Sequence, residues 1–142
     1  MRLGVPLEHD IQSLILNYLG VEKFAQVLRK GRLIWEGTGL YIGRHGLWWR
    51  NNGGGAKATY TNKSGQTKTR FIKYGVRGAA DILGSLRVSG RAAAIEVKRP
   101  GEKLDADQIQ WRDWWIQEGN GLWAMVTSLQ EAQEAVREWV AA

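Results

Sequence analysis

Residues 80–98 constrain the fold of this chain more than any other segment. Two short apolar runs, residues 80–84 and 92–98, flank the turn signal Ser89-Gly90, and Pro100-Gly101 ends the second run. Apolar runs of this length between turn residues predict two neighbouring β-strands joined by a turn. The remaining segments are then expected to cover the faces of a sheet.

The residues after this strand pair predict a helix, a strand and a last helix. Asp105 followed by Gln108 is typical of a helix N-terminus, and apolar residues at helical spacing follow. Residues 122–126 predict a buried strand. Ser128 with Glu131 predicts a capping box that opens the last helix. That helix is expected to turn four side chains inward, namely Leu129, Ala132, Val136 and Trp139.

The first half of the chain carries weaker signals. Residues 7–19 have apolar side chains at helical spacing, and residues 21–30 predict a second short helix. The segments that follow are a strand at 33–35, a strand at 46–50, a break at 51–55, a polar and mobile loop at 56–69 and a strand at 71–74. This order of elements predicts an α/β fold in one domain over residues 1–142, with a mixed central sheet flanked by helices.

Composition excludes several classes of protein. The 142 residues include no cysteine and only two histidines, which excludes disulfide frameworks, thiolate metal sites and a three-histidine metal site. No apolar run approaches the roughly 18–20 residues of a membrane span, and the start of the chain lacks the apolar stretch of a signal peptide. We therefore expect a soluble, cytoplasmic protein.

Charge is distributed unevenly along the chain. Residues 21–80 contain twelve lysines and arginines but only two acidic residues, whereas residues 81–142 contain seven basic and ten acidic residues. A basic segment beside an acidic one is typical of a surface for polyanions next to a site that needs carboxylates. A solvated basic loop explains the first segment equally well.

Asp81, Glu96 and Lys98 are the residues that indicate chemistry. Side chains alternate along a strand, so Glu96 and Lys98 share one face, with the small residues Ala92 and Ala94 beside them. Pairing of the two strands brings Asp81 close to Glu96. Two neighbouring carboxylates in a partly dry site repel each other, and a divalent cation with hard oxygen ligands, Mg²⁺ or Mn²⁺, removes that conflict. Such a site suits phosphodiester hydrolysis. Taken singly, however, a Glu-x-Lys pair is typical of a solvated strand face, and an aspartate before a strand often caps a turn.

This pattern resembles a known nuclease superfamily. Asp81, followed about fifteen residues later by Glu96-Val97-Lys98, is similar to the PD-(D/E)xK motif. More specifically, the chain resembles the VRR-NUC nucleases, which are often found in phages and are related to Holliday-junction resolvases. The resemblance covers most of the chain outside residues 21–45 and 56–68. Ala80 departs from the proline of the superfamily motif, a residue that shapes the turn but does not bind metal.

The resemblance implies an αβββαβ core and a role for each site residue. Asp81 and Glu96 would bind Mg²⁺ or Mn²⁺, with help from the carbonyl group of Val97. Lys98 would position or activate the attacking water. Glu8 would complete the site through a metal-bound water, although an acid that favours a helix N-terminus explains this residue as well.

Further residues are implicated as facing the site or the substrate. Gln108 matches a family glutamine that faces the site from the following helix. The tryptophans at 48, 49, 111, 114 and 115 are expected mainly in the core or an interface, with stacking on unpaired bases as the alternative. The candidate nucleic-acid-binding residues are Arg44, Arg50, Lys57, Lys63, Lys68, Arg70, Lys73, Arg77 and Arg99.

The leading functional hypothesis is a metal-dependent, structure-selective DNA endonuclease. The resemblance implies a branched substrate such as a Holliday junction, and a homodimer whose two sites suit two incisions on a symmetric substrate. A site-specific restriction-type nuclease is one alternative, although no element for reading the major groove is evident. A non-catalytic nucleic-acid-binding module is the other, in which Asp81, Glu96 and Lys98 are structural charges.

Overall fold

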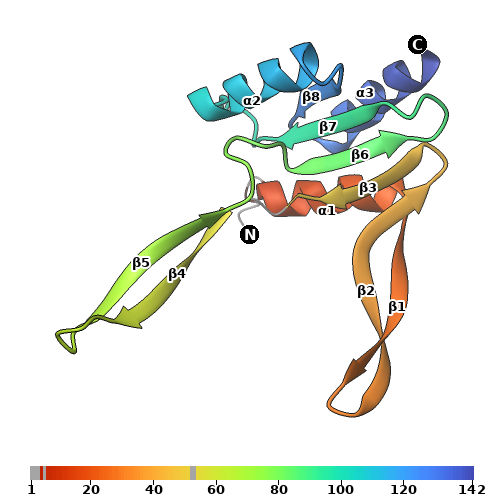
Figure 1. Ribbon diagram of the computed structural model, residues 1–142. Coiled ribbons are helices and arrows are strands. Elements are labelled where there is room, and N and C mark those ends of the chain that lie inside the picture. The colour runs from red at the N-terminus through yellow and green to blue at the C-terminus, as the bar shows by residue number, and fades with distance from the viewer. Residues whose placement is uncertain (1–3, 5, 52–53) are drawn as a thin grey trace.

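The computed structural model describes residues 4, 6–51 and 54–142, with the side chains of 54–56 and 72–74 outside that description. Three helices and eight strands follow one another within these residues (Figure 1). Their order is α1 (Glu8–Leu19), β1 (Val21–Arg29), β2 (Arg32–Gly43), β3 (Gly46–Arg50), β4 (Gly54–Thr61), β5 (Thr67–Tyr74), β6 (Ile82–Leu86), β7 (Ala92–Val97), α2 (Ala106–Gln117), β8 (Leu122–Val126) and α3 (Leu129–Ala141).

A mixed six-stranded sheet forms the centre of the molecule. Its strand order is β1-β2-β3-β6-β7-β8, and β4 pairs only with β5 in a separate two-stranded ribbon. Neighbouring strands of the large sheet are antiparallel except for β7 and β8, which are parallel and are connected through α2. Such a parallel pair needs a crossover connection, which the helix provides. The predicted α/β architecture with a mixed sheet is confirmed.

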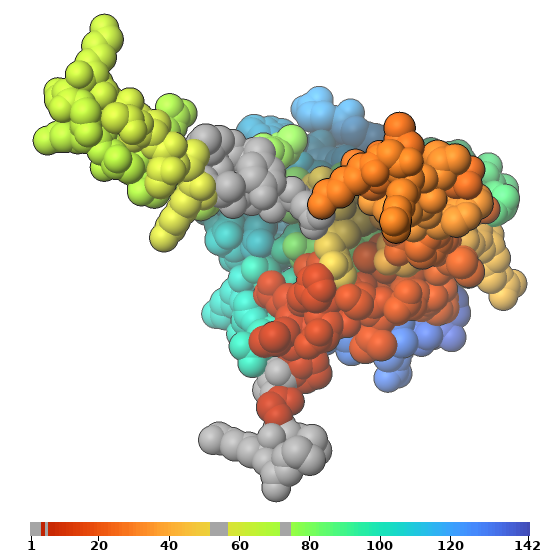
Figure 2. Space-filling model, turned by 90° about the horizontal axis from the view of Figure 1, so that it is seen from below, coloured from red at the N-terminus to blue at the C-terminus, as the bar shows by residue number. Residues whose placement is uncertain are grey.

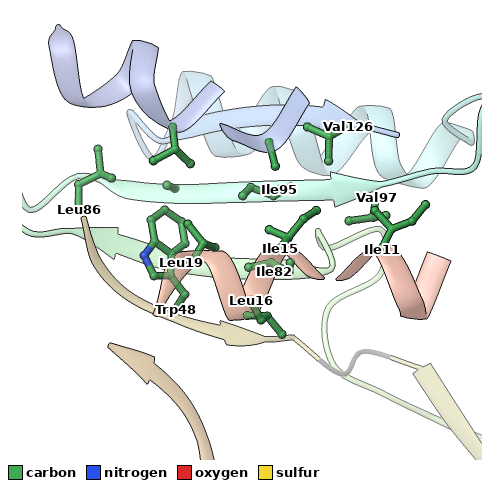
Figure 3. Close-up of a cluster of buried hydrophobic side chains, with 13 residues drawn as sticks. Ile11, Ile15, Leu16, Leu19, Trp48, Ile82, Leu86, Ile95, Val97 and Val126 are labelled. Atoms are coloured by element: carbon green, nitrogen blue, oxygen red, sulfur yellow. The ribbon is translucent and has the colours of Figure 1, made fainter. Parts of the chain in front are cut away.

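The two faces of the sheet are covered by different helices. On one face, Ile95 and Val97 of β7 pack among apolar side chains of α1 and α3 (Figure 3). On the other face, Ala94 packs against Trp111 of α2, and the ring of Trp115 stacks on that of Trp111 at a centroid distance of 4.7 Å. The alternation along β7 therefore divides the core into two layers. Ala94, one of the small residues predicted to leave room on the face of Glu96, makes space for the indole rings of Trp111 and Trp115.

Several predicted elements are confirmed, with small differences at their ends. The helix at 7–19 is α1, the strands at 46–50 and 122–126 are β3 and β8, and the pair at 80–98 is β6 and β7. Asp105 and Gln108 form a capping box at the start of α2. At α3, Ser128 accepts a hydrogen bond from the backbone N–H of Glu131, whereas the Glu131 carboxylate accepts from Thr127 rather than from Ser128.

The predicted second helix at 21–30 was wrong. These residues form β1, which pairs antiparallel with β2 from Arg29↔Arg32 at the tip to Val21↔Ile42 at the base. The strand predicted at 33–35 is only one part of the longer β2. Lys30 and Gly31, at the tip, both have positive φ, 49° and 74°. Two such residues make the tight turn whose twist matches antiparallel strands, and this local geometry overrides the helical spacing of Phe24, Val27 and Leu28.

The predicted loop at 56–69 was also wrong. Its residues belong to the β4–β5 ribbon, which also includes the strand predicted at 71–74. The turn between the strands is ordered by Asn62, whose side-chain oxygen accepts from the backbone N–H groups of Ser64 and Gln66 at 3.0 and 2.9 Å. Threonines at alternate positions of both strands favour extended backbone. Residues 52 and 53 of the predicted break lie outside the described residues.

The two hairpins project from the sheet as separate arms (Figure 1). We call residues 21–37 the apolar arm, because it exposes large apolar side chains, and residues 54–74 the basic arm, because its charged residues are all lysine or arginine. In the part of the chain that the structure describes, no helix covers either arm. No helix in the described ranges has the length and apolar character to cross a membrane.

Candidate functional site

Asp81 lies at the end of the sheet where β6 begins. Its Oδ2 accepts a hydrogen bond from the backbone N–H of Val97 at 2.8 Å, next to the Ile82↔Ile95 pair. The backbone N–H of Asn51 donates to the Asp81 carbonyl at 2.7 Å, which ties the end of β3 to the same point. Asp81 therefore continues the strand ladder with its side chain, as expected for a residue that caps a strand. The remaining carboxylate oxygen takes no part in that bond.

Glu96 lies on β7 beside Asp81 and is almost completely buried, with 3% of its surface exposed. Its Oε1 accepts a hydrogen bond from Nε2 of Gln108 at 3.0 Å. Gln108 is itself fixed by the capping box, because its Oε1 accepts from the Asp105 backbone N–H and its own N–H donates to Asp105 Oδ1. The start of α2 thus holds a donor against Glu96. The prediction that Gln108 faces these carboxylates is confirmed in its geometry.

Asp81 lies beside Glu96, because the pairing of Ile82 with Ile95 makes the two carboxylates neighbours. Burial, the charge of Asp81 and hydrogen bonding to the Asp81 carboxylate raise the pKa of Glu96 from 4.5 to about 9, against the opposing charge of Lys98. Burial also raises the pKa of Asp81, although the N–H of Val97 and the bond from Glu96 act in the opposite direction. With its pKa raised to about 9, the Glu96 carboxyl group is expected to carry a proton at neutral pH when no cation is bound.

Glu8 and Lys98 join the pair from two other elements. Lys98 follows β7 directly and is buried, and its backbone N–H donates to the carbonyl of Val126 at 2.9 Å. Glu8 is the first residue of α1, and its pKa is raised by burial, by a hydrogen bond with Glu102 and by the charges of Glu102 and Asp81, while the charge of Lys98 lowers it. The five residues predicted as catalytic, which include Gln108 on Glu96, thus lie near one another.

Glu102 belongs to this cluster and was missed in the sequence. It lies in the loop between β7 and α2, where its carboxylate is 4.0 Å from Nε of Arg99. Loop residues carry no periodic pattern, so only their position just after the end of a strand that bears site residues signals such a role. The cluster accordingly contains four carboxylates and one lysine, an excess of negative groups around a buried centre.

The carboxylates of this cluster are hard oxygen donors. Within the described ranges, no group of three or more His, Asp or Glu side chains is arranged to hold a metal ion. Mg²⁺ does not require such a cage, because it is commonly bound by one or two carboxylates while water and substrate phosphate supply the other ligands. Asp81 and Glu96 are such a pair, and the backbone carbonyl of Val97 between Glu96 and Lys98 is a further hard oxygen.

The structure separates the predicted nucleic-acid-binding residues into groups. Arg50 and Arg99 lie near the carboxylates, since the charge of Arg50 lowers the pKa of Asp81 and Arg99 pairs with Glu102. Arg50 is held by α1, where it donates to Oγ of Ser13 at 2.9 Å. The basic arm carries Lys57, Lys63, Lys68 and Arg70.

Three of the predicted basic residues belong neither to the group beside the carboxylates nor to the described side chains of the basic arm. Arg77 follows the arm and pairs with Asp107 of α2 at 3.8 Å. Lys73 lies on β5, but its side chain is outside the described residues. Arg44 lies at the opposite end of the sheet, where it lines a surface hollow with Leu86 and Trp139. Arg44 therefore lies apart from Arg50, because β3 separates the two residues.

The five tryptophans singled out in the sequence differ in how far they are buried. Trp48 is completely buried and Trp111 is 8% exposed, so both belong to the core. Trp115 is partly covered, and its Nε1 donates to the carbonyl of Leu122 at 2.9 Å. Trp49 and Trp114 expose 37% and 59% of their surfaces. Only this last pair, of the five, presents a substantial ring surface to solvent.

Comparison of the chain with protein-family models, with curated proteins and with solved structures found no match.

Proposed function

We propose that this protein is a Mg²⁺- or Mn²⁺-dependent endonuclease that hydrolyses phosphodiester bonds in DNA. The observation that carries the proposal is the pair of Asp81 and Glu96 carboxylates, which the Val97 N–H and the Gln108 amide hold beside the buried Lys98. In this proposal α1, β3, β6, β7, α2 and β8 correspond to the αβββαβ core of PD-(D/E)xK nucleases. The order β3-β6-β7-β8, with only the last pair parallel, supports that correspondence.

Each residue of the cluster has a role in the proposed reaction. Asp81 and Glu96 would hold the cation, with the Val97 carbonyl and with Glu8 acting through water. When bound, the cation supplies Lewis-acid stabilisation of the charge on the phosphate and lowers the pKa of water. Lys98 orients the attacking water and stabilises negative charge that develops on the phosphate oxygens. Gln108 keeps Glu96 in place by its hydrogen bond of 3.0 Å.

The proposed substrate is branched DNA such as a Holliday junction, and the protein would act in the cytoplasm of a cell or of a phage host. This selectivity rests on the resemblance to VRR-NUC nucleases in the residues from Asp81 to Lys98. Basic residues beside the site, Arg50 and Arg99, support a polyanionic substrate. A restriction-type nuclease remains the main alternative for the same chemistry.

We further propose a homodimer formed through the apolar arm. Its register places five side chains on one face, and four of these are large and apolar. These four are Phe24, Leu28, Leu33 and Trp35, which expose 58%, 66%, 67% and 67% of their surfaces. Side chains of this size expose roughly 450 Å² together, so two copies would bury roughly 900 Å² from these residues alone, close to the roughly 1,000 Å² of a specific interface.

The chemistry of this face favours a second copy of the chain over a charged partner. Gln26 is the one polar side chain on this face and it carries no charge, whereas the opposite face carries the ion pair between Arg29 and Glu36 at 2.9 Å. Isolated two-stranded hairpins are marginally stable in water, so burial of this face would also stabilise the arm itself.

The nuclease activity is tested with a panel of labelled substrates. Four-way junction, flap and linear duplex DNA are incubated with the protein in Mg²⁺ or Mn²⁺, and then with EDTA. Junction-selective cutting that EDTA stops supports the proposal. Cutting at one duplex sequence supports the restriction-type alternative, and retardation in a gel without any cutting indicates a non-catalytic binding module.

The variant Lys98→Ala separates catalysis from binding. We expect it to abolish cutting while junction binding persists, because the lysine acts on the water and phosphate rather than on the duplex as a whole. Lys103→Ala is the matched control, since Lys103 is an exposed lysine in the loop that follows Lys98. Loss of binding together with loss of the folded state would instead mark Lys98 as structural.

A further inference from the structure

The basic arm contains cationic side chains with no acidic residue among them. Residues 37–80 include eight lysines and arginines and not one aspartate or glutamate. Lys57, Lys63, Lys68 and Arg70 of this stretch lie on the arm and are exposed. A protein surface ordinarily mixes both signs of charge, so an arm of one sign favours a polyanionic partner.

Both faces of the arm carry a cation beside an aromatic ring. The register sets Lys57 opposite Phe71 on one face and Tyr60 opposite Lys68 on the other, with Arg70 next to Lys68. Phe71 and Tyr60 expose 59% and 45% of their surfaces. Figure 2 shows the arm extending away from the body of the molecule. An isolated two-stranded hairpin is only marginally stable in water, so a ligand bound along the arm would also stabilise it.

The base of the arm is tied to the candidate site at both ends. On the β4 side, Asn51 donates its backbone N–H to Asp81 and its side-chain amide to the carbonyl of Ala80 at 3.2 Å. On the β5 side, Gly78 (φ +77°) passes so close to α2 that a Cβ atom there would lie 2.2 Å from the carbonyl oxygen of Asp107. The residues on either side of the arm are therefore anchored beside Asp81 and α2.

The dimensions of the arm fit one groove of DNA. The major groove of B-form DNA, about 12 Å wide, admits a two-stranded β-ribbon, whereas the minor groove, about 6 Å wide, has to be widened or bent to take one. A strand such as β4, with eight residues, spans about 26 Å at roughly 3.3 Å per residue. That length corresponds to about eight base pairs at roughly 3.4 Å each.

We propose that the basic arm lies in the major groove of the duplex that flanks the cleaved bond. Lys57, Lys68 and Arg70 contact the phosphates on either side of the groove, and Lys63 at the tip contacts the phosphate farthest from the site. These contacts fix the position of the duplex and not its sequence. The proposal rests on the proposed nuclease function only for the location of the cut.

The test measures binding apart from cleavage. Fluorescence anisotropy of a labelled 20-base-pair duplex in EDTA gives the dissociation constant at several salt concentrations. We compare the full-length protein with the double variant Lys68→Ala/Arg70→Ala and with the charge-matched control Lys23→Ala/Arg137→Ala, whose positions are exposed on β1 and α3. A third variant, Lys68→Arg/Arg70→Lys, keeps both charges.

We expect the arm double variant to reduce the slope of log K against log salt by about two, since each lost phosphate contact removes about 0.9. The control and the charge-preserving variant should keep the wild-type slope. Hydroxyl-radical footprinting should show protection of about eight base pairs on one side of the position nearest Asp81. Duplex RNA should compete poorly, because its deep, narrow major groove excludes a ribbon.

The outcomes separate this inference from the nuclease proposal. An arm variant with the same slope and footprint as the control overturns the inference, even if the protein cuts DNA. Equal competition by duplex RNA overturns the placement in the major groove. Arm-dependent binding without any cleavage by the wild-type protein supports the inference and contradicts the nuclease function.

Discussion

Replacement of Glu96 by glutamine is expected to stabilise the metal-free protein. In the folded chain burial and Asp81 raise the pKa of Glu96 from 4.5 to about 9, so the carboxyl group remains protonated at pH 7. In the unfolded chain the same group is ionised. Because one pKa unit corresponds to about 1.4 kcal/mol, taking up the proton at pH 7 lowers the free energy of unfolding by about 3 kcal/mol. Glutamine avoids this cost.

The geometry allows glutamine to replace the protonated acid atom for atom. Its Oε1 accepts from Nε2 of Gln108, as the Glu96 oxygen does, and its own amide group donates toward Asp81 in place of the carboxyl proton. We therefore expect the full gain of about 3 kcal/mol as an upper bound, which corresponds to a rise in Tm of roughly 10 °C for a chain of this size. Most single substitutions destabilise a protein, so the sign is diagnostic.

The assay is thermal and urea unfolding in EDTA between pH 5 and pH 9. The wild-type free energy of unfolding should decrease as pH rises from 4.5 toward about 9, because the folded state holds a proton that the unfolded state releases. The profile of Glu96→Gln should be flatter. Glu134→Gln on α3, an exposed carboxylate whose oxygen accepts from Gln130, is the control and should change stability by less than about 0.5 kcal/mol.

Added Mn²⁺ should then invert the order of the two proteins. It should stabilise the wild type by about 4 kcal/mol at one thousand times its dissociation constant, which exceeds the advantage of Glu96→Gln in EDTA. Glu96→Gln should gain far less. The reasoning fails if Glu96→Gln is no more stable than Glu134→Gln in EDTA at pH 7, or if wild-type stability does not change between pH 5 and pH 9.

The remaining predictions concern Asp81 and the apolar arm. Asp81→Asn should keep the acceptor for the Val97 N–H and fold stably, but it should not bind Mn²⁺ in calorimetry. Asp81→Ala should lose both the acceptor and Mn²⁺ binding, and urea unfolding should show a loss of about 2 kcal/mol of stability. Equal Mn²⁺ uptake by wild type and Asp81→Asn would contradict the assignment of Asp81 as a metal ligand. Leu33→Ser/Trp35→Ser should shift the protein from dimer to monomer in sedimentation equilibrium, with Val88→Ser, at a position 96% exposed outside the arm, as control; a wild-type monomer at high concentration would exclude this interface.

The parts of the fold that could be predicted have local signals. The strand pair at 80–98 has turn residues at its boundaries, and α2 and α3 begin at Asp105 and Ser128, whose side chains cap them. The proximity of Asp81 and Glu96 follows from strand pairing alone, because the register of adjacent strands fixes which residues are neighbours. These predictions required no knowledge of contacts distant in sequence.

The arms could not be predicted in the same way. Periodicity reports which side of an element is buried, and neither arm lies against the core, so the spacing of Phe24, Val27 and Leu28 indicated a helix that does not exist. The Lys30-Gly31 turn was the better signal. Arg44 and Arg50 are close in sequence yet lie at opposite ends of β3, and charge counted along a chain does not distinguish the two ends of a strand.

Hydrogen bonds fix the positions of the Asp81 and Glu96 carboxylates but do not neutralise their charge. Neutral donors hold its two central carboxylates, the Val97 N–H on Asp81 and the Gln108 amide on Glu96, so both side chains are ordered before any ligand arrives. Neutral donors orient oxygen atoms but do not offset two buried negative charges, and the proton on Glu96 does so instead. A cation that binds here must displace this proton, so its affinity should rise with pH until Glu96 is ionised. In the proposed metal site, the hydrogen bonds to Asp81 and Glu96 would therefore stay in place when a cation binds, and only the proton would leave.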